Sequence, residues 1–312
     1  MLEHRLAKLA AAATFVLLVI GGTVNPTGSS LACPEPTLVC HGQLFPPMVG
    51  GVLYEHGHRL AAMTVGLLQI ALTFVLLRRG MKRLGWILLG LVIAQGALGA
   101  ITVGYKLPWF VSTGHLLLGM SYFATLIYTA FRTRPEPTAA EREEHARLRA
   151  ELGGARRWIA VASGAVFVQL LIGALVRHLG AAMVCLGMPS CTRSGDWWPE
   201  AGVQDLHMIH RGFGVVVAIV TTAAAVAVYR RARSWPALRL LALIAPALVM
   251  AQLVLGIYTV LTLRAVPLAV GHFAGAASLW ALWMSAWLLT APRAAAHALP
   301  AHDVPALHPV GA

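Results

Sequence analysis

Apolar residues dominate this chain in long runs separated by short polar segments. A run of about 20 apolar residues can cross the ~30 Å hydrocarbon core of a bilayer as an α-helix. Eight such runs lie at about 7–24, 56–77, 84–105, 110–131, 158–176, 207–229, 238–262 and 267–290. The pattern therefore predicts an all-α integral membrane protein with eight transmembrane helices.

The composition supports this class. Hydrophobic residues make up 58% of the 312 residues and charged residues only 12%, whereas a soluble domain usually carries about 25% charged residues. The eight runs also leave little sequence for a soluble domain.

The net charge of +12 comes from arginines and lysines that gather in alternate connections between the runs. They lie before the first run, after the second, between the fourth and fifth, and after the sixth. These segments share one side of the membrane, which the positive-inside rule makes cytoplasmic. We expect a multi-pass plasma-membrane protein with both termini in the cytoplasm. No basic patch with interleaved aromatic residues remains for binding nucleic acid.

The two halves of the chain resemble each other. A shift of 152 residues places Gly21 on Gly173, Cys33 on Cys185 and His58-Arg59 on His210-Arg211. A shift of 157 places Gln95 on Gln252, Gly99 on Gly256 and His115 on His272. Each half begins on the same side and contains an even number of spans, so the pattern predicts two tandem, parallel four-helix-bundle repeats.

These patterns divide the chain into four parts. We expect an N-terminal repeat at 1–131, a cytoplasmic linker at 132–157, a C-terminal repeat at 158–290 and a disordered tail at 291–312. The linker sequence AAEREEHARLRAEL predicts a short solvated helix. His297, His302 and His308 in the tail are too irregularly spaced to predict a metal site.

The four cysteines form two close pairs, Cys33 with Cys40 and Cys185 with Cys191. Both pairs fall in loops on the outer side, where disulfides persist. Two structural disulfides are the simplest interpretation, and a redox-active pair that passes electrons to quinone is the alternative. A zinc site is disfavoured, because the pairs belong to separate repeats and lack C-x-x-C spacing.

Four histidines lie near the outer ends of the even-numbered spans, at matched positions of the repeat: His58, His115, His210 and His272. Ionisable residues within membrane spans are rare and usually functional. Neutral imidazole is a good axial ligand for haem iron, and two helices that present one histidine each can hold a haem inside a four-helix bundle. The pattern predicts two haem sites toward the outer face.

Charged residues beside these histidines differ between the halves. Arg59 and Arg211 follow a histidine in both, and each could pair with a haem propionate or with a loop carboxylate. Glu55 lies three residues before His58 on the same helical face, whereas the repeat places His207 at that position. A carboxylate in one half only suggests that this half carries out chemistry. We interpret His56 and His207 as interfacial residues.

These residues resemble the haem A synthase family, membrane enzymes that oxidise a methyl group of haem O to the formyl group of haem A. The resemblance covers residues 7–290. The motifs that carry it are TGSSLACP at 27–34, CHGQ at 40–43, Glu-x-x-His-Arg at 55–59, His115, His-Arg at 210–211 and His272. Many members have a tryptophan between the first two cysteines, whereas this chain reads CPEPTLVC there, which leaves the detailed role of the first outer loop open.

The resemblance implies a role for each residue. His58 and His115, with Arg59, would bind the substrate haem, and Glu55 would be the catalytic carboxylate. His210 and His272 would ligate the iron of a resident haem b used for electron transfer, with Arg211 at its propionates. The pair Cys33–Cys40 would be the loop disulfide associated with activity, and Cys185–Cys191 its counterpart.

The implied enzyme is an oxidoreductase acting on a CH or CH2 group by successive hydroxylation. Its expected partners are haem O synthase, which is a protohaem farnesyltransferase, assembly factors of the terminal oxidase, and a second copy of itself in a homo-oligomer. Three alternatives remain from the residues alone. They are a two-haem b-type cytochrome that only relays electrons, a DsbB-like thiol oxidase, and a haem carrier without enzymatic activity.

Overall fold

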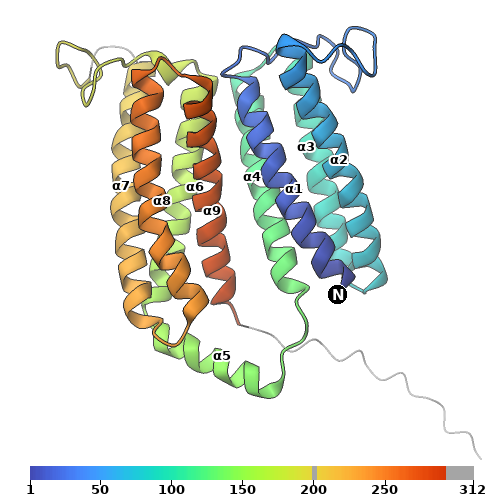
Figure 1. Cartoon of the computed structure of the whole chain (residues 1–312), viewed down its shortest axis with the longest axis vertical. Helices are drawn as coiled ribbons and strands as arrows, with labels where there is room; N and C mark the ends of the chain where they lie inside the picture. Colours follow the sequence, from blue (N-terminus) through green and yellow to red (C-terminus); the bar gives the residue numbers. More distant parts are fainter. Residues whose placement is uncertain (199–201, 293–312) are drawn as a thin grey trace, which may run out of the picture.

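Two four-helix bundles stand side by side in the computed structural model, which describes residues 1–198 and 202–292 (Figure 1). The first contains α1 (Leu2–Val24), α2 (Gly50–Arg78), α3 (Lys82–Gly104) and α4 (Trp109–Arg132). The second contains α6 (Ala155–His178), α7 (Gly202–Arg231), α8 (Pro236–Leu261) and α9 (Val266–Leu289). In the described part of the chain, these 8 helices are long and apolar enough to cross a membrane. This confirms the predicted all-α multi-pass membrane protein.

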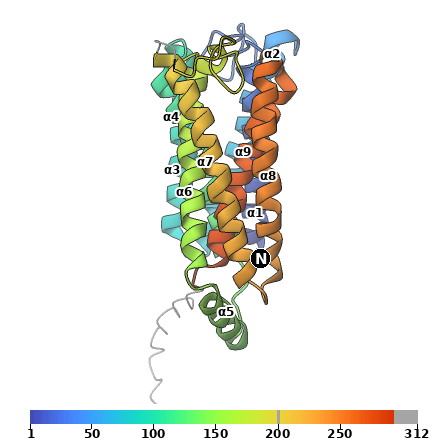
Figure 2. The same cartoon turned by 90° about the vertical axis from the view of Figure 1, so that its left-hand side faces the viewer.

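The bundles have two different ends. The α1–α2 and α6–α7 connections lie together at one end, which we call the loop end (Figure 1). At the opposite end, the α5 end, the chain begins and α5 (Ala139–Leu152) lies across the bundle, as the rotated view also shows (Figure 2). The expectation of a disordered tail with three scattered histidines concerns residues that, from 293 onward, lie outside the described part.

The helix α5 covers the sequence AAEREEHARLRAEL in which a short helix was expected. Its first turn is closed by a capping box, in which Thr138 and Glu141 satisfy each other's backbone N–H groups. Leu148 and Leu152 are buried, and the ring of His145 lies 2.9 Å from the carbonyl oxygen of Leu289. The helix is therefore attached along one face to the second bundle and is not free in solvent.

At the loop end, α2 and α7 begin several residues earlier than the hydrophobic pattern predicted. α2 starts at Gly50 and α7 at Gly202, whereas the apolar runs suggested 56 and 207. The residues gained at these two helix starts include polar ones, Glu55 in α2 and Asp205 in the first turn of α7, which the hydropathy of a membrane span excludes. Within the α2 extension, Glu55 contacts the preceding loop by accepting the backbone N–H of Cys33.

The core continues from one bundle into the other. α4 packs against α6 and α9, and α1 packs against α9. Met120 and Phe123 of α4 belong to the same buried cluster as Trp280 and Trp283 of α9. The indole N–H of Trp280 donates to the carbonyl oxygen of Met120 at 3.2 Å. The two bundles therefore share one apolar interior along their common face.

Candidate functional site

The four matched histidines occupy the same level of the two bundles, near the loop end. Each lies on a helix that begins at that end: His58 on α2, His115 on α4, His210 on α7 and His272 on α9. At 1.5 Å of rise per residue, their Cα atoms lie roughly 10 Å below the helix starts. All four side chains are partly buried. The fold thus brings His58 and His115 into the first bundle, and His210 and His272 into the second.

Each histidine ring packs directly against a glycine of the preceding helix. A methyl group on Gly21 would stand 2.7 Å from Cε1 of His58, and the corresponding distances are 3.2 Å for Gly99 and His115, 3.1 Å for Gly173 and His210, and 3.3 Å for Gly256 and His272. All four distances are shorter than ordinary carbon contacts of about 3.5–4.0 Å. These positions therefore need glycine, because any side chain would displace the ring.

The glycines that precede histidines along the chain, such as Gly57 and Gly114, do not contact the rings in this way. A methyl group on Gly114 would meet no atom within 4 Å, and one on Gly57 would meet only Met48, at 3.8 Å. The signal that could have found the contacting glycines was already present in the repeat. It pairs Gly21 with Gly173 and Gly99 with Gly256, in step with the histidines.

Replacing Gly173 with Ala should displace the ring of His210 and destabilise the protein by about 1–3 kcal/mol, because the new methyl group overpacks the contact. Thermal unfolding of the purified protein measures this. Gly164→Ala is the matched control, since it lies on the same helix with no atom within 4 Å of its added methyl group. That control should be neutral or stabilising. An equal loss in both variants would contradict the packing role of Gly173.

Glutamines position two of the histidines. The amide nitrogen of Gln95 donates to the carbonyl oxygen of His115 at 2.9 Å and lies 3.3 Å from its Nε2. Gln169 does the same for His210, at 2.9 Å from the carbonyl oxygen and 3.2 Å from Nδ1. Nδ1 of His272 lies 3.1 Å from the backbone carbonyl of Gln252, whereas Nδ1 of His58 is buried without a hydrogen-bond partner in the described part of the chain.

The second bundle holds its two histidines at a separation that suits an iron ligand pair. The ring centres of His210 and His272 are 6.3 Å apart. Two imidazoles that bind one iron from opposite sides, with bonds of about 2 Å each, have ring centres roughly 6 Å apart. The Nδ1 atom of His272 is oriented by a carbonyl oxygen, as is usual for metal-ligating histidines. The pair therefore fits a haem iron between its rings.

Glu55 is held by the loop that covers the first bundle. The side chain is only 4% exposed. One carboxylate oxygen accepts the backbone N–H of Cys33 at 2.8 Å, and the other accepts a guanidinium N–H of Arg59 at 2.5 Å. A carboxylate has about four lone-pair sites, so both oxygens can accept a further proton or hydrogen bond. Glu55 therefore connects α2 to the disulfide loop at the level of the candidate site.

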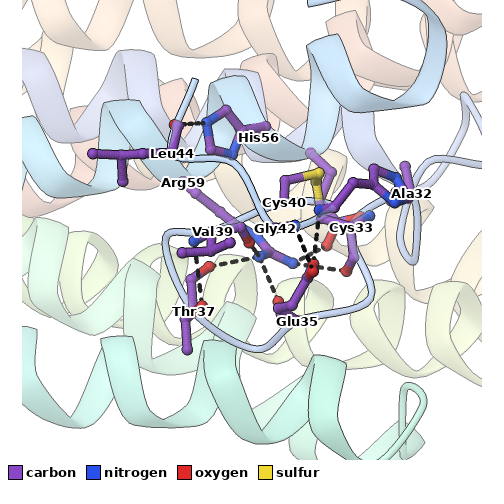
Figure 3. The surroundings of a disulfide bond; sticks show 12 residues. Ala32, Cys33, Glu35, Thr37, Val39, Cys40, Gly42, Leu44, His56 and Arg59 are labelled. Atoms are coloured by element: carbon purple, nitrogen blue, oxygen red, sulfur yellow. Dashed lines mark hydrogen bonds and ion pairs between the residues drawn. A yellow bond between two sulfur atoms is a disulfide. The ribbon is translucent and has the colours of Figure 1, made fainter. Parts of the chain in front are cut away.

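Arg59 also binds the loop between α1 and α2 that contains Cys33 and Cys40 (Figure 3). Beyond Glu55, its guanidinium donates to four backbone carbonyls, those of Cys33, Glu35, Thr37 and Val39. Arg211 repeats the arrangement in the second bundle. It donates to the carbonyls of Cys185, Gly187, Pro189 and Ser190. The structure thus directs both arginines to the loops, and their predicted pairing with haem propionates stays a prediction.

A carboxylate accepts several hydrogen bonds in each loop. Glu35 accepts the backbone N–H groups of His41 and Gly42, each at 3.0 Å. The pKa of Glu35 is lowered by a hydrogen bond from its own backbone N–H and by these two bonds. Asp196 accepts the hydroxyls of Ser194 and Thr192, which lower its pKa. Each loop is therefore folded around an ionised carboxylate.

Both predicted disulfides are present, Cys33–Cys40 and Cys185–Cys191. The first is buried next to His56, which is 0% exposed and lies 3.0 Å through Nε2 from the carbonyl oxygen of Leu44 (Figure 3). The two sulfurs and a ring nitrogen of His56 lie within 4.8 Å of one another. Because the sulfurs are bonded to each other, this group offers no thiolates for a metal.

The second loop has different neighbours at the same positions. Met208 takes the place of His56 and packs on the buried Cys185 and Cys191. His207 takes the place of Glu55 and is also buried, at 4% exposure, so it does not face water. The arginine that bonds the loop carbonyls is thus common to both bundles, whereas the position of Glu55 carries a carboxylate only in the first bundle.

The fold and the two histidine pairs define a multi-pass membrane protein whose helical bundles present paired imidazoles, an arrangement able to ligate haem. The chain belongs to the COX15-CtaA family, described as cytochrome oxidase assembly protein, whose model matches residues 48–284.

Curated relatives cover most of the chain. The protein of Caulobacter sp. (strain K31) named Heme A synthase is 32% identical over 286 residues, 83% of this chain and 79% of that protein. A Heme A synthase of Geobacillus kaustophilus (strain HTA426) is 28% identical over 283 residues, 87% of each chain. One of Exiguobacterium sibiricum is 29% identical over 222 residues, 68% of this chain and 72% of that protein. These matches confirm the family that the sequence motifs indicated.

Proposed function

We propose that this protein is a haem A synthase, which oxidises a methyl substituent of haem O to a formyl group by successive hydroxylation. The family membership and the relatives named Heme A synthase support the activity. The observation that carries the assignment to particular residues is the buried Glu55, one helical turn from His58 in the first bundle only. Its counterpart in the second bundle is His207.

The first bundle is the proposed substrate site. His58 and His115 bind the iron of haem O, and Arg59 holds the loop over them and orients Glu55. Glu55 accepts a proton released during hydroxylation, or stabilises positive charge that develops at the oxidised carbon. Both tasks suit a carboxylate in a site from which the loop excludes water.

The second bundle is the proposed site of a resident haem b, which supplies electron transfer when bound. His210 and His272 are its ligands, and the 6.3 Å between their ring centres supports this. Gln169 and the carbonyl of Gln252 fix the two imidazoles, and such outer contacts typically change metal affinity 10–100-fold. Arg211 holds the loop of this bundle, and its predicted contact with the propionates remains part of the proposal.

The membrane arrangement follows from the repeat and the charges. We place the α5 end and both termini in the cytoplasm, with both haem sites toward the outer face of the plasma membrane. The two bundles would be tandem, parallel repeats joined by the linker at 132–157. The expected partners are haem O synthase, which would deliver the substrate, terminal-oxidase assembly factors that would receive the product, and a second copy in a homo-oligomer.

Expression of the chain together with a haem O synthase tests the activity. The haems are extracted from the membranes and separated by chromatography. Haem A, identified by its formyl group, is expected in cells that carry both proteins and absent when either is omitted. If haem O accumulates unchanged while the protein retains bound haem, the protein is an electron relay or a carrier and the proposed function is wrong.

A further inference from the structure

Haem carries two propionate carboxylates, and the arginines next to the histidines are already engaged elsewhere. Arg59 and Arg211 direct their guanidinium groups to loop carbonyls, and Arg59 also to Glu55. A ligand with two carboxylates would meet few free cations there. The loop end also holds a cation that lacks an anionic partner in the described part of the chain.

Arg177 is such a cation. It lies in the last turn of α6, and its Nε is buried without a hydrogen-bond partner. Its guanidinium lies 6.0 Å from the ring centre of Phe273, which is a weak contact. No carboxylate of the described residues pairs with it. A guanidinium with a buried, unpaired Nε is unfavourable unless an anion or another hydrogen-bond acceptor binds it.

A second cation, Arg264, lies near Arg177, and two neighbouring positive charges are unfavourable unless an anion binds between them. Arg264, in the connection between α8 and α9, is close enough for its positive charge to repel that of Arg177. Within the described part of the chain, the guanidinium of Arg264 makes one hydrogen bond, which is long, 3.5 Å to the side-chain oxygen of Asn25. Two neighbouring arginines without a carboxylate are the usual composition of a site for an anionic group.

The two arginines lie where the bundles meet. His178, next to Arg177, lies 3.2 Å through Nδ1 from the hydroxyl of Thr113 on α4, and so ties α6 to the first bundle. Phe273, beneath the guanidinium, packs against Gly22 of α1, where an added methyl group would stand 2.8 Å from it. The neighbouring residue, Gly21, is the one that contacts His58.

Arg177 has no arginine counterpart in the first half of the chain. The shift of 152 residues places Asn25 at the position of Arg177. The neutral Asn25 therefore stands where a symmetric protein would have a second arginine.

We propose that Arg177, supported by Arg264, binds a carboxylate of the tetrapyrrole held by His58 and His115. The second bundle then completes the substrate site of the first by supplying its carboxylate-binding group. This inference rests on the proposed function, because it assumes a haem in the first pocket. Arg177 is a positioning residue in this scheme and takes no part in proton transfer.

Haem titration tests the proposal, with haem b as the probe because it carries the same two propionates. Full-length protein with its resident haem is titrated with haem b or with haem b dimethyl ester, in which both carboxylates are esterified. Binding that is lost in His115→Ala defines uptake by the first pocket. Arg177→Gln should weaken this uptake of haem b by about tenfold or more, and Arg177→Lys should weaken it less.

The dimethyl ester distinguishes a direct contact between Arg177 and a haem carboxylate from a general change in the pocket, because the ester has no free carboxylate. Wild type and Arg177→Gln should bind the dimethyl ester equally, and the spectrum of the resident haem should be the same in both. Arg193→Gln is the charge-matched control, since Arg193 is exposed in the α6–α7 loop, and it should change neither affinity. Equal haem b affinity in wild type and Arg177→Gln, or an equal loss with the ester, overturns the role of Arg177 alone. Absence of His115-dependent uptake in wild type overturns the substrate pocket itself.

Discussion

Replacing Glu55 with Gln is expected to lower the conversion of haem O to haem A by about 100-fold or more, the usual contribution of a positioned acid–base group. Gln is isosteric, and its amide oxygen can still accept the N–H of Cys33, which Glu55 bonds at 2.8 Å. Binding of haem to both pockets should therefore persist. Haem extraction from cells that also make haem O synthase gives the conversion, and the visible spectrum gives the occupancy.

Glu35→Gln is the control for this experiment. Glu35 is also a carboxylate that holds the first loop, through the backbone N–H groups of His41 and Gly42, but its side chain is only partly buried and bonds these loop amides, whereas Glu55 bonds Arg59. We expect it to retain most of the conversion. If haem A forms at the normal rate in Glu55→Gln, or if Glu35→Gln fails equally, Glu55 serves only to fold the loop.

Replacing His272 with Met is expected to change the resident haem in the second bundle. Histidine–methionine ligation raises the reduction potential of a haem relative to two imidazoles. We expect an upward shift on the order of 100 mV, within the wide range that axial ligands control. Redox titration of the purified protein, followed in the visible spectrum, measures it.

Two other histidines serve as controls. His58→Met lies in the other pocket and should leave the potential of the resident haem unchanged. His178→Met removes a histidine at the same end that belongs to neither pair and contacts Thr113. A spectrum and potential that are unaltered in His272→Met would show that His272 is not a ligand of this haem.

The membrane spans could be predicted from the sequence because a bilayer imposes a simple length and hydropathy on every helix. The same rule failed at the loop ends of α2 and α7. Glu55 and Asp205 lie there on helical turns that extend beyond the apolar run. The cysteine pairs were also predictable, since few residues separate their members. Local spacing was sufficient for each of these features.

The details of the site needed the tertiary structure. Arg59 and Glu55 are both identifiable from their spacing to His58, but the loop carbonyls that Arg59 binds lie 20 to 26 residues away along the chain. The contact between Gly21 and His58 depends on how closely α1 approaches α2. Arg177 was not singled out at all, because its significance comes from two bundles meeting at their loop ends.

The shared interior of the two bundles has a consequence for how the protein unfolds. Met120 and Phe123 of α4 lie in one buried cluster with Trp280 and Trp283 of α9, and a hydrogen bond joins Trp280 to Met120. Either half, expressed alone, would leave part of this surface uncovered within the bilayer. The two bundles should therefore melt in a single cooperative transition, and neither is an autonomous folding unit despite its complete set of four helices.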